Sequence, residues 1–104
     1  MIITNVENLP HKEILEHHGI VSGSTVRAKH AGRDFMAGLK NFFGGELTSY
    51  TELLAESRDE AINRMKAQAE EFGANAILNV RFSTSSVAAG AAELYVYGTA
   101  VTVR

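Results

Sequence analysis

The residues best able to bind a metal ion are gathered in one short stretch, "HKEILEHH" (11–18). Imidazole nitrogens and carboxylate oxygens suit zinc, nickel or copper. On a helix, Glu13 and His17 would be neighbours, whereas on a strand Glu16 and His18 would share a face. The chain contains no cysteine, so a metal site could not use thiolate.

The candidate metal ligands are therefore His17, His18 and, further along the chain, His30. Two observations weaken this hypothesis. The adjacent His17 and His18 could not both reach one ion from a strand, and no recognised ligand spacing is present. The alternative is that these histidines are polar surface residues, although a ring of subunits could still gather one histidine per subunit around its axis.

A second candidate site surrounds the adjacent glycines Gly44 and Gly45, within "KNFFGGELTSY" (40–50). Gly44 fits the left-handed residue that ends a helix, and Gly45 would let the backbone turn sharply. Such a turn directs backbone N–H groups toward one region at a helix N-terminus, where an anion can bind, or where Glu46 itself could lie. The pair predicts either a purely structural corner between two helices or a cradle for a ligand.

The polar side chains near this corner are Arg33, Asp34, Glu46 and Tyr50. In the binding hypothesis they line a pocket, which could lie between subunits, where Arg33 holds an anion and Tyr50 orients it. In the structural alternative, Arg33 pairs with a carboxylate and ties the first helix to the corner or to the next subunit. The sequence leaves both interpretations open and favours the structural one.

Enzymatic chemistry is not predicted. The chain lacks a cysteine nucleophile, and no serine or threonine lies in a nucleophile-elbow pattern. The glycine of "GANAILN" (73–79) follows a helical segment and precedes a strand, the reverse of the strand, glycine loop and helix order that binds phosphate. We expect a protein that is not an enzyme, with an enzyme whose site is shared between subunits as the weakest alternative.

The composition limits the class of protein. A chain of 104 residues predicts a single domain, 1–104. The net charge of −2 and the absence of a Lys/Arg cluster argue against binding to nucleic acid or an anionic membrane. No basic region with a long apolar run begins the chain, and no apolar stretch approaches the roughly 20 residues that span a bilayer. We therefore expect a cytoplasmic protein.

Two helical segments must position the candidate residues. "RDFMAGLKNFF" (33–43) carries its large apolar residues on one helical face. The second helix, about 48–72, has an apolar stripe that includes Tyr50, Ala61, Met65 and Phe72. Gly73 is expected to end this helix.

The remaining segments are predicted as strands, at 1–6, about 13–29, 75–86 and 93–104. In the third strand, alternation places Ala76, Leu78, Val80 and Phe82 on one face. The order β-β-α-α-β-β predicts an α+β domain, in which a four-stranded, mainly antiparallel sheet carries two helices on one face.

The final strand, "ELYVYGTAVTV" (93–103), is largely apolar or aromatic on both of its faces. A sheet covered by helices on one side should show one polar face. The second face is therefore expected to meet another subunit, which predicts a homo-oligomer.

The chain also resembles a known family over nearly its whole length. The matching segments, in order, are "GIVSGS" (19–24), the "RD" of 33–34, "GGELTSY" (44–50), "GANAILNVRF" (73–82) and "YGTAVTV" (97–103). These segments resemble the YbjQ family of small bacterial proteins, which are often labelled heavy-metal-binding. The resemblance implies an α+β subunit in a ring-like homo-oligomer, which is expected to be a pentamer, with no established biochemical activity.

The leading hypothesis is a non-enzymatic homo-oligomer of uncharacterised role whose only expected partner is itself and whose ligand is unknown. The alternative is a metal-binding or metal-buffering protein that uses histidine and carboxylate at subunit junctions. No cofactor is expected under the first hypothesis, and a divalent metal is expected under the second.

Overall fold

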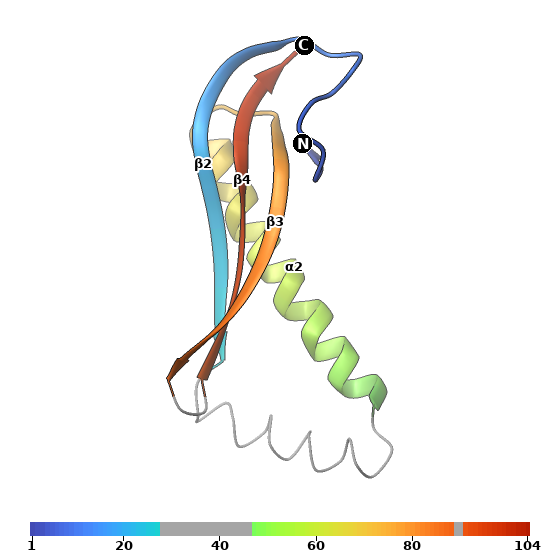
Figure 1. The fold of residues 1–104 in the computed structure, drawn as a ribbon, viewed down its shortest axis with the longest axis vertical. Helices are drawn as coiled ribbons and strands as arrows, with labels where there is room; N and C mark the ends of the chain where they lie inside the picture. The colour runs from blue at the N-terminus through green and yellow to red at the C-terminus, as the bar shows by residue number, and fades with distance from the viewer. Residues whose placement is uncertain (28–46, 89–90) are drawn as a thin grey trace.

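A computed structural model describes residues 1–27, 47–88 and 91–104 of the chain. The predicted first helix, 33–43, lies outside these residues. Figure 1 shows the described elements along the chain. They are β1 (Ile2–Ile3), β2 (Ile14–Arg27), α2 (Leu47–Glu71), β3 (Ala76–Ala88) and β4 (Ala91–Val103).

The four strands form one sheet in the order β1-β3-β4-β2. The long strands pair antiparallel, β4 with both β2 and β3, whereas β1 pairs parallel with β3. The α+β class and the four strands are thus confirmed, but the sheet is mixed. The parallel pair arises because the N-terminal segment runs along β3 in the same direction, with Thr4 N–H donating to the Ile77 carbonyl and Val80 N–H to the Thr4 carbonyl, both at 3.0 Å.

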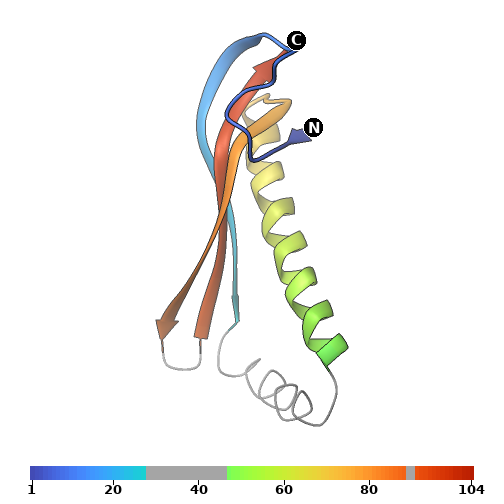
Figure 2. The ribbon, with the colours of Figure 1, turned by 45° about the vertical axis from the view of Figure 1, so that its right-hand side comes forward.

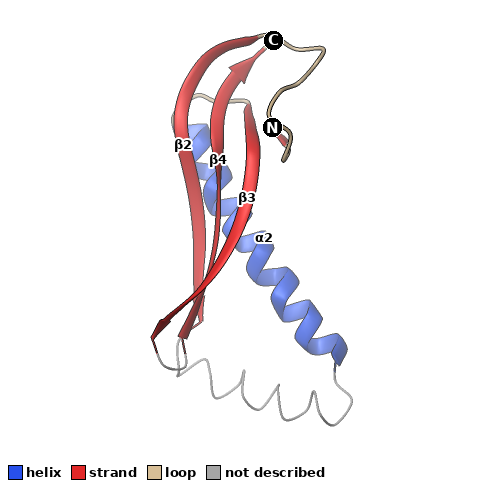
Figure 3. Cartoon of the chain, viewed as in Figure 1, coloured by secondary structure: helices blue, strands red, loops and turns tan. Residues whose placement is uncertain are grey.

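Helix α2 packs against one face of this sheet, as Figures 2 and 3 show from two directions. Its stripe of Ala61, Met65 and Ala69 is fully buried. The stripe packs in one cluster with the sheet residues Val21, Ile77, Val80, Val96 and Ala100. The predicted stripe is confirmed at these positions, but Phe72 at the end of the helix is 47% exposed. No helix among the described residues is long and apolar enough to cross a membrane.

Gly23 of β2 lets the helix approach the sheet closely. A Cβ atom at this position would lie 2.1 Å from the backbone oxygen of Ala61 and 2.7 Å from the backbone nitrogen of Met65. Such distances are impossible for a real side chain, so only glycine allows α2 to lie this near to β2. Gly23 therefore has a packing role.

Gly73 ends α2, as predicted. Its φ of +81° is a conformation that glycine adopts at no steric cost. The N–H of Gly73 donates to the Glu70 carbonyl, and the N–H of Ala74 donates to the Ala69 carbonyl. These are the two hydrogen bonds of a Schellman motif, which satisfies carbonyls at the helix end.

A β-bulge at Asn79 divides β3 into two parts. Asn79 has a φ of +55°, and the pairing with β4 shifts by one residue between Leu78 and Arg81. Because one extra residue reverses the alternation of side chains, Ala76 and Leu78 face away from α2. The prediction that they share a face with Val80 and Phe82 is therefore wrong.

The face of the sheet away from α2 is partly covered by the chain itself. Leu9, in the segment between β1 and β2, and Ile14 pack against a second buried cluster. This cluster consists of Ala76, Leu78, Val101 and Val103. At this end of the sheet the chain itself therefore covers part of the second face, and the contact of that face with another subunit stays a prediction.

Candidate functional site

The two candidate histidines of β2 lie on opposite sides of the sheet. His17 pairs with Val101 of β4, whose side chain belongs to the cluster away from α2. The register then shifts between His17 and Gly19, so that His18 is the extra residue of a bulge. The His17 side chain is exposed, whereas only 11% of the His18 side chain is accessible.

A short hydrogen-bond chain holds His18 in place on the helix side of the sheet. Its Nε2 lies 2.7 Å from the Oγ1 of Thr102, and this hydroxyl oxygen lies 3.2 Å from the carbonyl oxygen of Gly73, to which it can donate. The tautomer of the His18 ring decides which group donates in the bond between His18 and Thr102. The chain links β2, β4 and the end of α2, and Glu16 adds a carboxylate oxygen 3.9 Å from the same nitrogen.

This arrangement does not fit a metal site within one subunit. The Nε2 of His18 is engaged in the hydrogen bond with Thr102, and only 11% of the His18 side chain is accessible. His17 lies on the other face of the sheet. Within the described residues, no group of three or more His, Cys, Asp or Glu side chains could hold a metal ion.

The corner candidates Arg33, Asp34, Gly44, Gly45 and Glu46 all lie in the segment outside the described residues, and so does His30. The backbone of Tyr50 lies in α2, but its side chain is not described. The corner site and the contribution of His30 to a metal site therefore remain predictions from the sequence.

Two side chains of α2 form hydrogen bonds with backbone groups at the outer edge of β2. The Gln68 side-chain oxygen accepts a hydrogen bond from the Ser22 N–H at 2.8 Å, and Arg64 donates to the Ser24 carbonyl. Arg64 also pairs with Glu60 one turn earlier, as the sequence predicted. An edge strand with free backbone groups invites pairing with another chain, and these contacts occupy two such groups.

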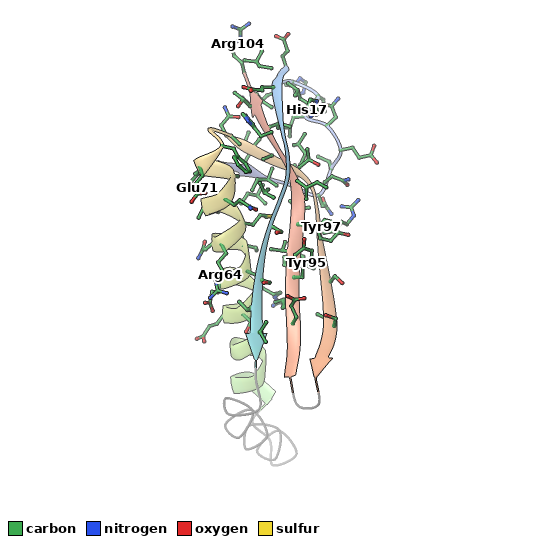
Figure 4. All side chains as sticks on the ribbon, turned by 90° about the vertical axis from the view of Figure 1, so that its left-hand side faces the viewer. His17, Arg64, Glu71, Tyr95, Tyr97 and Arg104 are labelled. Atoms are coloured by element: carbon green, nitrogen blue, oxygen red, sulfur yellow. The ribbon has the colours of Figure 1, made fainter. Side chains whose placement is uncertain are left out.

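An open surface lies on the face away from α2, beyond the part that Leu9 covers. Figure 4 shows Tyr95 and Tyr97 on β4, with Arg64 and Glu71 on the helix. The two tyrosine rings are stacked, with their centroids 5.4 Å apart. The register places Ser22 beside Tyr97 and Ser24 beside Tyr95. We call this surface the tyrosine face and define it by Ile20, Ser22, Ser24, Val26, Tyr95 and Tyr97.

The tyrosine face exposes large apolar side chains. Ile20 is 75% exposed and Tyr97 is 37% exposed. Tyr95 is half-buried on the same surface.

Sequence reasoning missed a second open surface, on the helix side of β3. Phe82 pairs with Val96, a buried residue of the cluster under α2, so Phe82 faces the same side as the helix. Helix α2 lies mainly over β2 and least over β3, and Phe82 stays 47% exposed. We call this surface the phenylalanine face and define it by Phe82 and Thr84. The signal missed in the sequence was Asn79, a residue that tolerates the left-handed conformation of a bulge.

Comparisons with known proteins place the chain in one group. A family model described as "Putative heavy-metal-binding" matches residues 1–104. A UPF0145 protein of Hahella chejuensis is 67% identical over 104 residues, with complete coverage of both chains. A UPF0145 protein of Archaeoglobus fulgidus is 56% identical and covers 100% of this chain and 96% of its own. Neither name carries an enzyme activity.

A crystal structure supports the fold. It is a protein of unknown function from Pediococcus pentosaceus, assigned to the DUF74 family, and it superimposes with a TM-score of 0.64. The match covers 100% of this chain and 98% of the other, at 15% sequence identity. At that identity the likeness establishes the shared fold alone.

Proposed function

The chain belongs to the YbjQ family of uncharacterised proteins, and on that premise we propose that it is a non-enzymatic subunit of a ring-like homo-oligomer. The ring binds a ligand that is still to be identified. The number of subunits we propose is five, as the family resemblance implies. The single observation that carries the proposal is the surface that the subunit leaves open.

That surface is larger than a compact monomer would show. A monomer of 11.3 kDa exposes roughly 5,700 Å². This chain exposes 6940 Å², about 1,200 Å² more than that expectation. A standard interface takes about 800 Å² from each partner, so the excess is sufficient for at least one subunit contact.

The shape of the subunit leads to the same proposal. The radius of gyration is 16.6 Å, and the molecule measures 51 × 25 × 17 Å. A compact domain of this length has a radius of gyration of about 13 Å. Large apolar side chains, among them Ile20, Tyr97 and Phe82, contribute to the exposed surface.

Native mass spectrometry tests the proposal directly. Untagged protein at micromolar concentration, purified without a chelator, should give one species at a multiple of the 11.3 kDa subunit mass. Five copies would match the expected ring. A single species at the subunit mass across the micromolar range would refute the proposal.

The family description favours metal binding as the second candidate function. Since one subunit brings no suitable group together in the described residues, a site would need ligands from more than one subunit. The exposed His17 could contribute one such ligand. In the same mass spectra, a fixed number of metal ions per ring would support this function, provided that His17→Asn removes them. Rings without added mass after incubation with zinc, nickel or copper salts would exclude binding of those ions.

A further inference from the structure

We propose that the ring is closed by a head-to-tail contact in which the phenylalanine face of one copy packs on the tyrosine face of the next. This inference rests on the proposed homo-oligomer and identifies the two surfaces that form it. The occupant of each open surface is thus a second copy of this chain.

The amount and kind of exposed surface support this occupant. The excess of about 1,200 Å² over a compact monomer is of the size that subunit contacts bury. Aromatic residues are enriched in the buried centres of such contacts. Phe82 on one surface and the stacked Tyr95 and Tyr97 on the other supply them.

The chemistry of the two faces is compatible. Phe82 and Thr84 carry no charge, and the six residues that define the tyrosine face are aromatic, aliphatic or hydroxyl-bearing. A phenyl ring placed against tyrosine rings gains about 0.5–1.5 kcal/mol beyond the burial of its area. The register also places Arg81 beside Tyr97 and Glu93 beside Val26, and the Arg81 guanidinium already donates to the Asn5 and Val80 carbonyls.

The position of the two faces decides the symmetry. Phe82 shares its side of the sheet with Val96 under α2, whereas Tyr95 and Tyr97 point to the opposite side. The two surfaces are therefore different patches that face opposite directions. A contact between different patches is heterologous and repeats from copy to copy, whereas a two-fold dimer uses one patch twice. It gives a closed ring when the rotation between neighbouring copies closes, and an open filament when it does not.

The edge of the sheet also favours a contact between sheet faces over backbone pairing between edge strands. Pairing through β2 would require its outer backbone groups, but Gln68 and Arg64 occupy those of Ser22 and Ser24. A continuous sheet through β2 is thus disfavoured at these residues. The contact between the two faces of neighbouring sheets needs no free backbone group.

The test uses two single variants, Phe82→Asp and Tyr97→Asp, alone and mixed. Each variant alone should be folded and monomeric by native mass spectrometry, because each lacks one half of every junction. Mixed in equal amounts, they should form a one-to-one heterodimer. The intact tyrosine face of the first meets the intact phenylalanine face of the second, and the assembly stops at two copies.

Phe72→Asp is the matched control, because Phe72 is equally exposed, at 47%, but belongs to neither face. It should assemble as the wild type does. If either aspartate variant fails to fold by circular dichroism, Phe82→Ser and Tyr97→Ser replace them in the same mixing experiment.

The outcomes separate this inference from the proposed function. A monomeric wild-type chain would refute both the proposed homo-oligomer and the head-to-tail contact. A wild-type oligomer that persists in either single variant, or two monomeric variants that do not pair on mixing, overturns the head-to-tail contact and leaves the homo-oligomer standing. A heterodimer in the mixture, with neither variant assembling alone, supports the contact.

Discussion

At the scale of single residues, the buried hydroxyl of Thr25 is expected to lower the free energy of unfolding. It lies on β2, is only 4% exposed, and its hydroxyl oxygen has no hydrogen-bond partner among the described residues. A buried hydroxyl without a partner costs about 1–3 kcal/mol of desolvation. Thr25→Val removes the hydroxyl and keeps the branched shape, so we expect the free energy of unfolding to rise by about 1 kcal/mol. Urea denaturation measures this change through the transition midpoint.

Ser57 of α2 provides the control for Thr25. It is also buried, at 6% exposure, but it makes a polar interaction. Ser57→Ala should therefore lower the free energy of unfolding by about 1 kcal/mol. If Thr25→Val destabilised the protein as much as Ser57→Ala, the Thr25 hydroxyl would have to be bonded.

Asn79 adopts a backbone conformation that most residues avoid. Its φ of +55° lies in the left-handed region, and its N–H donates to the Val6 carbonyl at 2.9 Å. A β-branched residue in this conformation loses about 1–2 kcal/mol. Asn79→Val should lower the melting temperature accordingly, whereas Asn79→Gly should change it little. Equal melting temperatures for the two variants would show that the bulge relaxes without cost.

At the scale of elements, the contact between α2 and β2 depends on one missing side chain. Gly23→Ala places a Cβ against the backbone of Ala61, which cannot move without shifting the helix. Overpacking of this kind costs about 1–3 kcal/mol, occasionally more, and backbone contact places Gly23→Ala at the upper end. We expect a loss of about 3 kcal/mol, measured by chemical denaturation.

Gly19→Ala is the comparison for Gly23→Ala. A Cβ at Gly19 meets no atom within 4 Å, so only its φ of +98° opposes alanine. That cost is about 1 kcal/mol. If Gly19→Ala were as damaging as Gly23→Ala, backbone strain rather than the approach of the helix would explain both.

The sequence predicted the helices and strands better than it predicted which face of the sheet each side chain occupies. The periodicity of Ala61, Met65 and Ala69 gave α2 and its buried stripe correctly, because a long helix repeats its signal over many turns. The bulges at His18 and Asn79 were not predicted, because a single extra residue leaves no periodic trace in the sequence. Each bulge reverses the side-chain alternation, and the reversal at Asn79 placed Phe82 on the helix side.

At the scale of the whole molecule, the described residues leave part of the long sheet uncovered on both of its sides. The N-terminal segment buries one end of the far face through Leu9, and α2 covers β2 and part of β4 on the other side. The remaining tyrosine and phenylalanine faces lie on opposite sides. A small domain with such surfaces loses the burial that normally offsets the conformational entropy of folding, so association should contribute to its stability.

That coupling predicts a melting temperature that depends on protein concentration. When folded subunits are held by association, a hundredfold rise in concentration stabilises each by up to about 2.7 kcal/mol through mass action. For a domain of this size, that shift corresponds to an increase on the order of 10 °C. Calorimetry of the wild type at about 2 and 200 µM should show this increase, since those concentrations give the hundredfold ratio. Phe82→Asp should melt at one temperature throughout, because a chain that cannot assemble gains nothing from concentration. A wild-type melting temperature that stayed constant would mean that the subunit is stable without its neighbours.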